Sequence, residues 1–492
     1  MRGRKKERHP FLAFALFVLA AGAAFAHQPR LVDDRPSIIS VRTVIGYGSP
    51  NKAGTYKVHG SPLGPEEIRL TKAAYGVDPD AVFDIAPGVL SHFRAAAEEG
   101  EHLVAEWERR LTAYADAFPA EAAELRRRID GRLRPNWDEG LPAYASEDDG
   151  LATRNASQKA LEGLKDGVPE LLGGSADLSG SNLTDLEGEG VFSATESGRN
   201  IRFGVREHAM GGIANGIAYH GGLIPFVGTF LPFSDYMRGS VRLAALSGLG
   251  VIYVWTHDSI GVGEDGPTHQ SVEHYAALRA MPNLTFVRPA DGNETSAAWA
   301  LAVEQRHGPT ALALTRQKLP ILPGTAELAG TGVRAGAYVL AEAVTPDGTA
   351  TSPRLILLAT GSEVSLAMAA RETLVAEGIP TRVVSMPSWE RFEAQPAAYR
   401  DEVLPPAVTA RVAIESGVSL GWDRWVNARE GAIIAIDRYG ASAPAGEIFE
   451  RFGFSPENVV QVARGVLSGE VRGVISPGVE HPGRGLDQVE AS

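Results

Sequence analysis

The 492-residue sequence contains no cysteine, so disulfide bonds and thiolate metal sites are excluded and the redox compartment is left open. Basic residues are also in the minority: 47 Lys and Arg stand against 60 Asp and Glu, which gives a formal net charge of −13. Binding of nucleic acid needs a basic surface, so this balance argues against nucleic acid as a partner. A small anionic substrate in a locally basic pocket is compatible with it.

Long apolar runs are scarce, with the exception of Phe11–Ala26, which follows the basic segment MRGRKKERHP. This run is shorter than the ~20 residues of a membrane-spanning helix, so no stable membrane span is predicted. It ends in Ala24-Phe25-Ala26, which is typical of a secretory signal peptide. The alternative is a stretch translated from a misplaced start, and residues 1–30 are therefore interpreted as a leader, signal-like or spurious.

What the sequence does contain is an alternation of helices and short apolar strands, from Gly150 to about Pro320 and again from Gly336. Such alternation predicts two α/β domains, each built on a parallel sheet covered by helices. Ser362 is a plausible N-cap for a helix in the second domain. The predicted strands are 223–227, 249–255, 355–358, 382–386, 411–414 and 432–436, and a small-residue helix is predicted over 209–220.

The segment before these domains is predicted to be helical. Pro and acidic residues place a helix start at Gly64-Pro65. Residues 89–133 have helical spacing that is broken at Pro119, which predicts two helices. The polar segment 134–149 is interpreted as a linker, and the Gly- and Glu-rich residues 468–492 as a loose tail.

The stretch THDSIGVGEDGPTHQ, residues 256–270, follows one of the predicted strands directly. Ligands of open α/β sheets bind at the carboxyl ends of strands, so this position favours a functional loop. A metal site is disfavoured because His257 and His269 are twelve residues apart, and a Walker loop is excluded because G-K-[ST] is absent. The remaining interpretation is a substrate loop, in which histidines donate to phosphate or sugar oxygens and an acid accepts from a hydroxyl.

Several motifs resemble those of transketolase, the thiamine-diphosphate-dependent sugar-phosphate enzyme. They are GSPNKAGTYKVHGSPLG (48–64), GGSADLSGSNLT (173–184), GVREHAMGGIANGIAYHGG (204–222), TFLPFSDY (229–236), GEDGPTHQ (263–270), LALTRQ (312–317), ATGSEV (359–364) and VVSMPSWERF (383–392). They occur in the family's order, from about Leu31 to Leu467. The resemblance implies a pyrimidine-binding domain over 150–325 and a transketolase C-terminal domain over 336–467.

The resemblance implies residues that bind the cofactor. Glu207 matches the glutamate beside the aminopyrimidine ring of thiamine diphosphate, where a carboxylate shares a proton with a ring nitrogen. Taken alone, Glu207 between Arg206 and His208 is typical of a surface ion pair. Phe233 matches the aromatic residue that stacks on the pyrimidine, and Phe230 and Tyr236 are expected to line the same pocket.

The resemblance also implies residues that bind the substrate. Arg154 and Arg316 match arginines that bind the sugar phosphate, and guanidinium groups suit a phosphate dianion. Asp265 matches the acid that recognises a C2 hydroxyl. Ser181 and His257 match further phosphate contacts, and His59 and His269 match histidines near the reacting carbons that are able to shuttle protons.

The family pattern is not matched throughout. The family holds the cofactor's diphosphate through Mg²⁺ with a G-D-G motif and a downstream Asn, and this pattern is absent here. Tyr56 stands where the family usually has histidine. Residues 31–133 are therefore interpreted as a remnant of the diphosphate-binding domain, and the Mg²⁺ ligands are expected on a missing N-terminal part.

The sequence thus favours transfer of a two-carbon ketol unit from a ketose phosphate to an aldose phosphate. The protein is expected to be cytoplasmic, or exported if the leader is a signal. It is expected to act as a homodimer or with a partner chain that supplies the diphosphate-binding domain. A non-catalytic fragment that serves as an oligomerisation module is the alternative. A deoxyxylulose-phosphate synthase is disfavoured by Arg154, His257, Asp265 and Arg316 together.

Overall fold

The computed structural model describes residues 40–476, so the proposed leader 1–30 and residues 477–492 of the tail lie outside the described part. The chain divides into two units, Met1–Tyr114 and Ala115–Ser492. The first unit contains η1 (Tyr56–Val58), α2 (Pro65–Tyr75) and most of α3 (Pro87–Ala117). Gly64 caps α2 and Pro65 is its first residue, as predicted.

In the first unit, α2 holds the glycine-rich loop through one buried carboxylate. Glu67 accepts hydrogen bonds from the backbone N–H and the side-chain amide of Asn51, both at 2.9 Å, and from the hydroxyl of Ser49. The end of α3 and the start of α4 (Pro119–Ile129) fall on either side of Phe118, which confirms the predicted break at Pro119. Proline fits there because the first helical position needs no backbone donor.

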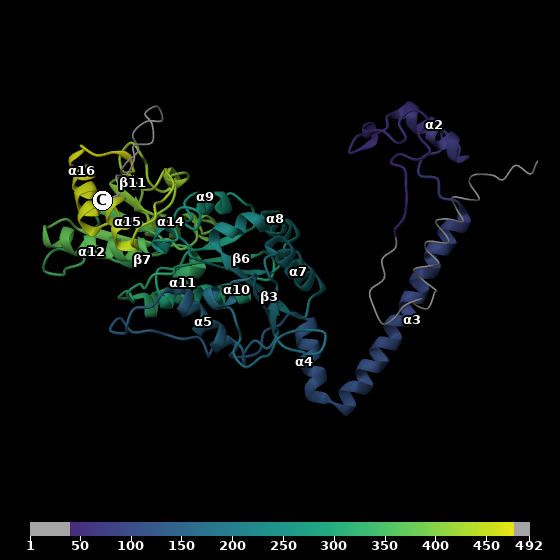
Figure 1. The fold of residues 1–492 in the computed structure, drawn as a ribbon, viewed down its shortest axis with the longest axis horizontal. Helices are drawn as coiled ribbons and strands as arrows, with labels where there is room; N and C mark the ends of the chain where they lie inside the picture. The colour runs from purple at the N-terminus through teal and green to yellow at the C-terminus, as the bar shows by residue number, and fades with distance from the viewer. Residues whose placement is uncertain (1–39, 477–492) are drawn as a thin grey trace, which may run out of the picture. The chain divides into compact units, whose positions relative to one another are not determined.

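The second unit contains two six-stranded sheets (Figure 1). The first has the order β2-β1-β3-β4-β6-β5 and all its strands are parallel. Its strands are β1 (Leu171–Ser175), β2 (Asn200–Arg202), β3 (Ile224–Phe230), β4 (Ile252–Thr256), β5 (Thr285–Val287) and β6 (Thr310–Leu314).

Both faces of this first sheet are buried. In β4, Ile252 and Val254 pack with the helices α5 (Thr153–Leu164) and α10 (Gly292–Glu304) on one face. Tyr253 and Trp255 pack on the other face with the cluster that includes α7 (Glu207–His220) and α8 (Arg238–Ser247). A strand covered on both faces has no polar face, which is why these strands read as continuous apolar runs in the sequence.

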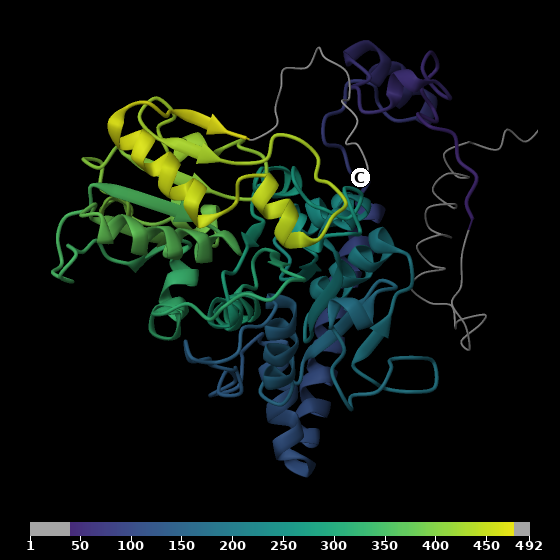
Figure 2. The same ribbon diagram turned by 60° about the vertical axis from the view of Figure 1, so that its left-hand side comes forward.

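The second sheet has the order β12-β11-β10-β8-β9-β7. Figure 2 draws this part of the chain in green to yellow. Its strands are parallel except β7, which pairs antiparallel with β9. They are β7 (Tyr338–Ala341), β8 (Leu355–Ala359), β9 (Thr381–Ser385), β10 (Arg411–Ile414), β11 (Ala432–Ile434) and β12 (Gly473–Ile475). The helices α12 (Glu363–Ala376) and α16 (Pro456–Ser468) pack together over one face.

The shorter elements connect these layers. They are α6 (Ser179–Asn182), η2 (Leu231–Met237), η3 (Ile260–Val262), α9 (His274–Arg279), α11 (Thr325–Ala335), α13 (Trp389–Glu393), α14 (Ala397–Val403), η4 (Trp422–Arg424) and α15 (Ala445–Arg451). In the described part of the chain, no helix is both long and apolar enough to cross a membrane.

The prediction of two α/β domains is confirmed, and two details of it are corrected. Gly473–Ile475, placed by composition in a loose tail, forms the edge strand β12 because it pairs with β11. Ser362 does stand at the N-cap of α12, but its hydroxyl donates to the carboxylate of Glu363 instead of accepting from a backbone N–H.

Candidate functional site

The candidate site lies where three neighbouring strands of the first sheet end. β3 ends at Phe230, β4 ends directly before His257, and Arg316 follows two residues after the end of β6. Because β3, β4 and β6 are adjacent and parallel, their carboxyl ends bring these side chains to one edge of the sheet. The placement predicted for the loop 256–270 is therefore confirmed, at the edge where open α/β sheets bind ligands.

Five aromatic rings meet at this edge. Phe230 stacks on His257 with ring centroids 3.6 Å apart, and on Phe233 at 5.6 Å. Phe233 in turn stacks on Tyr236 at 5.9 Å, and His269 meets Phe230 and Phe233 edge-on at 6.3 and 5.5 Å. Phe230 caps the 3₁₀ helix η2, in which residues three apart eclipse one another, so the spacing aligns the three aromatic side chains.

Glu207 is the first residue of α7 and is half-buried. A carboxylate is favourable at a helix N-terminus because the helix dipole is positive there. The surface ion pair that the isolated sequence suggests is not formed within residues 40–476. Arg206 instead donates from Nη1 to the carbonyl of Phe203 at 2.9 Å. Since α7 packs against both η2 and β3, Glu207 belongs to the same layer as the aromatic rings.

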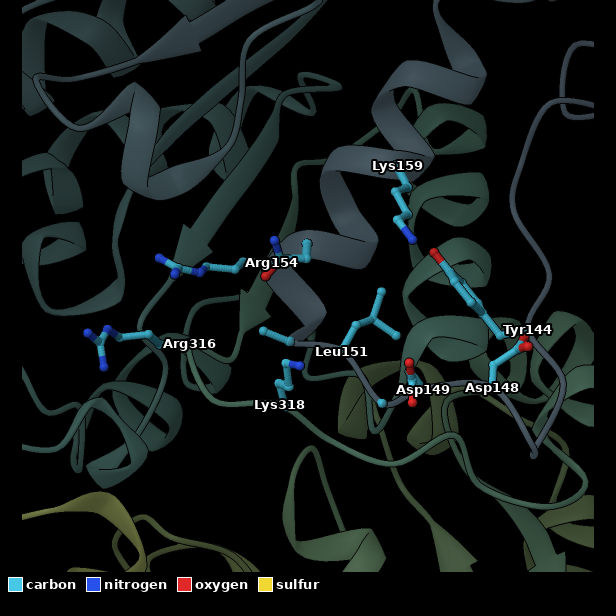
Figure 3. Close-up of a pocket in the computed structure, with 11 residues that line it drawn as sticks. Tyr144, Asp148, Asp149, Leu151, Arg154, Lys159, Arg316 and Lys318 are labelled. Atoms are coloured by element: carbon cyan, nitrogen blue, oxygen red, sulfur yellow. The ribbon is translucent and has the colours of Figure 1, made fainter.

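Arg154 and Arg316 line one pocket of about 710 Å³. Figure 3 shows both guanidinium groups extending to the same side of this pocket. Arg154 Nη1 donates to the carbonyl of Ser181 at 2.9 Å, and Arg316 Nη1 donates to that of Val262 at 3.4 Å. Burial and the positive charge of Arg316 lower the pKa of the Arg154 guanidinium. An anion bound at both arginines would therefore offset the electrostatic repulsion between the two guanidinium groups.

Further charged residues line the same pocket and were not found from the sequence. They are Lys159, Lys318, Asp148 and Asp149. Lys159 lies over the ring of Tyr144, with Nζ 5.7 Å from the ring centroid, on the side of the pocket away from the arginines (Figure 3). The sequence signal that could have identified Lys318 as a pocket residue is its spacing, since it lies two residues after Arg316.

His257 is almost fully enclosed, with 3% of its surface exposed. Burial, together with the charges of Arg154, Arg316 and His269, lowers the pKa of His257 to about 3. The imidazole is therefore neutral near pH 7. Its Nδ1 lies 2.7 Å from the hydroxyl oxygen of Thr256.

The rest of the loop 256–270 is held by the C-terminal domain. The side-chain amide of Gln270 donates at 2.8 Å to the carbonyls of both Gly263 and Ala441. Asp265 is exposed on this loop, and no hydrogen bond or ion pair engages its carboxylate in the part of the chain that the structure describes. His269 is half-buried, and its Nδ1 lies 2.9 Å from the hydroxyl of Thr268.

Ser181 and His59 are the two remaining predicted site residues. Ser181 is half-buried in α6 and engages Arg154 through its carbonyl, so its hydroxyl has no demonstrated role. His59 follows η1 in the first unit and is exposed, as is Tyr56 at the start of the same turn.

Comparison with known proteins places the whole arrangement in one family. The model of the transketolase pyrimidine binding domain matches residues 149–321, and that of the transketolase-like C-terminal domain matches 336–455. A transketolase of Craterostigma plantagineum is 48% identical over 442 residues, which cover 89% of this chain and 83% of that protein. The chain belongs to the transketolase family.

Other transketolases agree over a smaller share of their own length. That of Geobacillus stearothermophilus is 56% identical over 88% of this chain, but the chain spans 64% of that relative. The crystal structure of a Pichia stipitis transketolase in complex with sedoheptulose 7-phosphate superposes with a TM-score of 0.83 at 41% identity. That match covers 92% of this chain and 65% of the Pichia chain.

The third family match corrects the prediction of a largely missing domain. The transketolase thiamine diphosphate binding domain matches residues 20–134, so the prediction that this domain is mostly absent is not borne out. The match begins inside the apolar run Phe11–Ala26, which the sequence pattern assigns to a leader. A partner chain that supplies this domain is likewise not supported.

The aromatic edge of this transketolase-family chain fits the aminopyrimidine of thiamine diphosphate. Phe233 and Tyr236 line a pocket of about 220 Å³, and the Glu207 carboxylate is neither fully buried nor ion-paired within the described residues. The fit does not extend to the metal. Among residues 40–476 no group of three or more His, Asp or Glu side chains is placed to hold an ion.

Proposed function

We propose that this chain acts as a transketolase, a transferase that moves a two-carbon ketol unit from a ketose phosphate to an aldose phosphate. The observation that carries the proposal is the convergence of Arg154 and Arg316 on one pocket, beside the aromatic cluster at the carboxyl ends of β3, β4 and β6. This edge combines a phosphate site with a platform for a flat heterocycle. The Pichia relative was solved with a sugar phosphate, which supports the same substrate class.

The residues divide the work by their chemistry. The two arginines bind the phosphoryl group, and the Asp265 carboxylate accepts a hydrogen bond from a substrate hydroxyl. Glu207 shares a proton with a ring nitrogen of thiamine diphosphate while Phe230, Phe233 and Tyr236 hold the ring. The cofactor, when bound, supplies an electron sink for cleavage of the carbon–carbon bond. His269 and His59 are the proposed proton carriers.

The test is a ketol-transfer assay with thiamine diphosphate and Mg²⁺, using a ketose phosphate and an aldose phosphate. The wild-type chain is expected to be active, and Glu207→Gln is expected to lose about 10²- to 10⁴-fold in kcat, the usual contribution of a positioned proton carrier. The matched control is Glu196→Gln, an exposed glutamate on a turn of the same domain. Absence of transfer by the wild-type chain, with no cofactor binding in calorimetry, would favour the non-catalytic oligomerisation module.

We also propose that the chain forms a homodimer. The helices α7 and α8 expose large apolar side chains: Ile213 (48%), Tyr219 (80%), Leu243 (53%) and Leu246 (71%). Apolar surface of this kind is typical of an interface with another chain. A second copy of this chain is the proposed occupant, because α7 and α8 pack against each other and expose these apolar side chains together. Analytical ultracentrifugation of wild type and Leu246→Glu tests this, and a monomeric wild type at micromolar concentration would contradict it.

Two further assignments belong to the same proposal. The domain boundaries 150–325 and 336–467, with 134–149 as a linker, are supported by the position of the two sheets. The location is proposed to be cytoplasmic because sugar phosphates and thiamine diphosphate are intracellular metabolites. Mass spectrometry of the mature N-terminus tests it, since a chain that begins at His27 would show cleavage of a signal peptide.

A further inference from the structure

A line of buried hydrogen bonds runs from the backbone of β3 to the imidazole of His257. Ser175 Oγ donates to the carbonyl of Gly228 at 2.9 Å, and Asn182 Nδ2 donates to Ser175 Oγ at 2.6 Å. Thr256 Oγ1 lies 2.6 Å from Asn182 Oδ1 and 2.7 Å from His257 Nδ1. Ser175, Asn182 and Thr256 are fully buried. These three side chains, together with the Gly228 carbonyl, are called the relay below.

The donor and acceptor capacities of these groups fix the direction of the relay. A carbonyl only accepts, and a hydroxyl has one proton to donate. If Ser175 donates to Gly228, Asn182 donates to Ser175 and Thr256 donates to Asn182, then Thr256 can only accept from His257. All four contacts are then hydrogen bonds, and the imidazole proton is on Nδ1.

The reverse direction makes one hydrogen bond fewer. An Asn182 amide turned around would accept from Ser175 and donate to Thr256, whose hydroxyl would then donate to His257 Nδ1. Ser175 Oγ would face the Gly228 carbonyl at 2.9 Å with no proton between the two oxygens. A buried polar contact without its proton is unfavourable, so the first direction is preferred.

We propose that the relay holds His257 as the Nδ1-protonated tautomer with a bare Nε2, so that a phosphoryl dianion receives a hydrogen bond from Nε2 only when the relay reverses its direction. The inference deepens the proposed function and rests on it for the identity of the ligand. Ser175, Asn182 and Thr256 are positioning residues, since they act on the ligand only through His257.

The coupling follows from the charges at the site. A phosphoryl dianion presents only acceptors, and a bare Nε2 presents only a lone pair, so no hydrogen bond joins them unless a proton is placed on Nε2. Arg154, Arg316 and His269 are the charged or titratable groups that act on His257, and they oppose its protonation in the free protein. The imidazole therefore stays neutral, and its one proton moves from Nδ1 to Nε2 by exchange with solvent. This reversal costs the one hydrogen bond between Ser175 and the Gly228 carbonyl.

The tautomer is tested without any ligand by nitrogen NMR of the chain labelled with ¹⁵N-histidine, with the His257 signals assigned by their loss in His257→Asn. Wild type and Thr256→Ser, which keeps the hydroxyl, are expected to show a protonated, pyrrole-type Nδ1 and a pyridine-type Nε2. Thr256→Val is expected to shift the proton toward Nε2. The matched control is Thr229→Val, because Thr229 is fully buried and its hydroxyl has no hydrogen-bond partner among the described residues. A protonated Nε2 in the wild type would overturn the inference.

The coupling is tested by calorimetry with a pentose 5-phosphate in two buffers of different ionisation enthalpy. At about pH 8, well above the second pKa near 6 of a phosphate monoester, wild type is expected to bind with no net proton uptake, because the imidazole stays neutral. Thr256→Val has no relay to reverse and is expected to bind about 2- to 10-fold more tightly than wild type, while Thr256→Ser is expected to bind like wild type.

The two proposals fail in different ways. Absence of sugar-phosphate binding by the wild type would contradict the proposed function, while the NMR result would still decide the tautomer. Equal affinity of wild type and Thr256→Val, or net proton uptake by the wild type, would overturn the coupling and leave the phosphate site intact.

Discussion

Arg288 offers the sharpest test of how the candidate site is supported. Its side chain is fully buried, and its Nε donates to Asp258, the residue after His257, at 2.8 Å. Its Nη1 pairs with Glu363 at the start of α12 and donates to the carbonyl of Thr360 at 3.0 Å. One guanidinium thus joins the loop 256–270 to the C-terminal domain. Arg288→Met removes the charge and retains most of the volume.

The loss of unfolding free energy expected for Arg288→Met follows from the burial of the Asp258 and Glu363 carboxylates. Asp258 and Glu363 have side chains that are 0% exposed, so loss of Arg288 leaves two uncompensated charges without water. Removal of one partner from a buried ion pair costs about 3–5 kcal/mol. Arg288→Met is therefore expected to lower the free energy of unfolding by at least that amount near neutral pH.

The direction in which the stability loss of Arg288→Met changes with pH follows from the pKa of Asp258. Burial raises the pKa of Asp258 above its usual 3.8, and Arg288 opposes that rise. Without Arg288 the pKa is higher still, so the folded state binds more protons than the unfolded state over a wider range above pH 3.8. Stability then falls as pH rises. The loss caused by Arg288→Met is thus expected to be larger at about pH 8 than at about pH 5.

The assay is urea unfolding of wild type and variants at both pH values, since urea leaves the ionic strength unchanged. The control is Arg451→Met, because Arg451 pairs with Glu447 at the surface with 72% and 45% of their side chains exposed. That pair is expected to contribute less than about 1 kcal/mol. The combined replacement Arg288→Met, Asp258→Asn and Glu363→Gln is expected to recover much of the loss. Equal effects of Arg288→Met and Arg451→Met would refute the reasoning.

Three further outcomes are expected. Arg316→Met is expected to raise KM for phosphorylated donors by about 10- to 100-fold, because a hydrogen bond to a charged group contributes ~1.5–3 kcal/mol. KM for non-phosphorylated ketoses is expected to stay nearly unchanged. An equal rise in KM for both kinds of donor would contradict a phosphate-binding role of Arg316. Phe233→Ala is expected to weaken thiamine diphosphate binding by about 5- to 100-fold, from ~1–3 kcal/mol of stacking, and fluorescence titration that shows no loss would remove Phe233 from the cofactor site. Burial raises the pKa of Glu294 to about 7, so its contribution to stability is lost as pH rises from about 4.5 through 7. Glu294→Gln, which keeps neutral hydrogen bonding to Tyr338 and Ser385, is expected to flatten unfolding stability between pH 5 and 8, and an unchanged slope would place that titration elsewhere.

The fold was predictable where buried strands appear in the sequence as apolar runs. The strand predicted at Arg411–Ile414 matches β10 in full, and β3 and β4 fall on predicted apolar runs with ends shifted by a few residues. The strand β12 was missed because Gly473–Ile475 is short and only half-buried to exposed. Its conformation depends on pairing with β11, a long-range contact that local sequence does not encode.

The candidate site was also predictable only in part, because some of its contacts depend on the tertiary structure. Motif resemblance located His257 and Arg316, and parallel strand order explains why residues so far apart converge. Ser175 and Asn182 lie in the motif 173–184 and Thr256 begins the stretch 256–270, but the sequence does not show that these small polar side chains contact one another. Their importance depends on contacts between β1, α6 and β4 that span 7 and 74 residues of sequence. Hydrogen-bond direction is therefore knowable only once those side chains are placed.

The C-terminal domain contacts the loop 256–270 of the candidate site, although the two are far apart in the sequence. The loop 256–270 is tied to this domain near both ends, through Asp258 and Arg288 to Glu363, and through Gln270 to the carbonyl of Ala441. The helix η3 between these ties also packs against α15. A loop fixed at both ends has little conformational freedom left to lose on binding a ligand, so more of the interaction free energy would appear as affinity. The C-terminal domain therefore restricts the loop 256–270, which belongs to the pyrimidine binding domain.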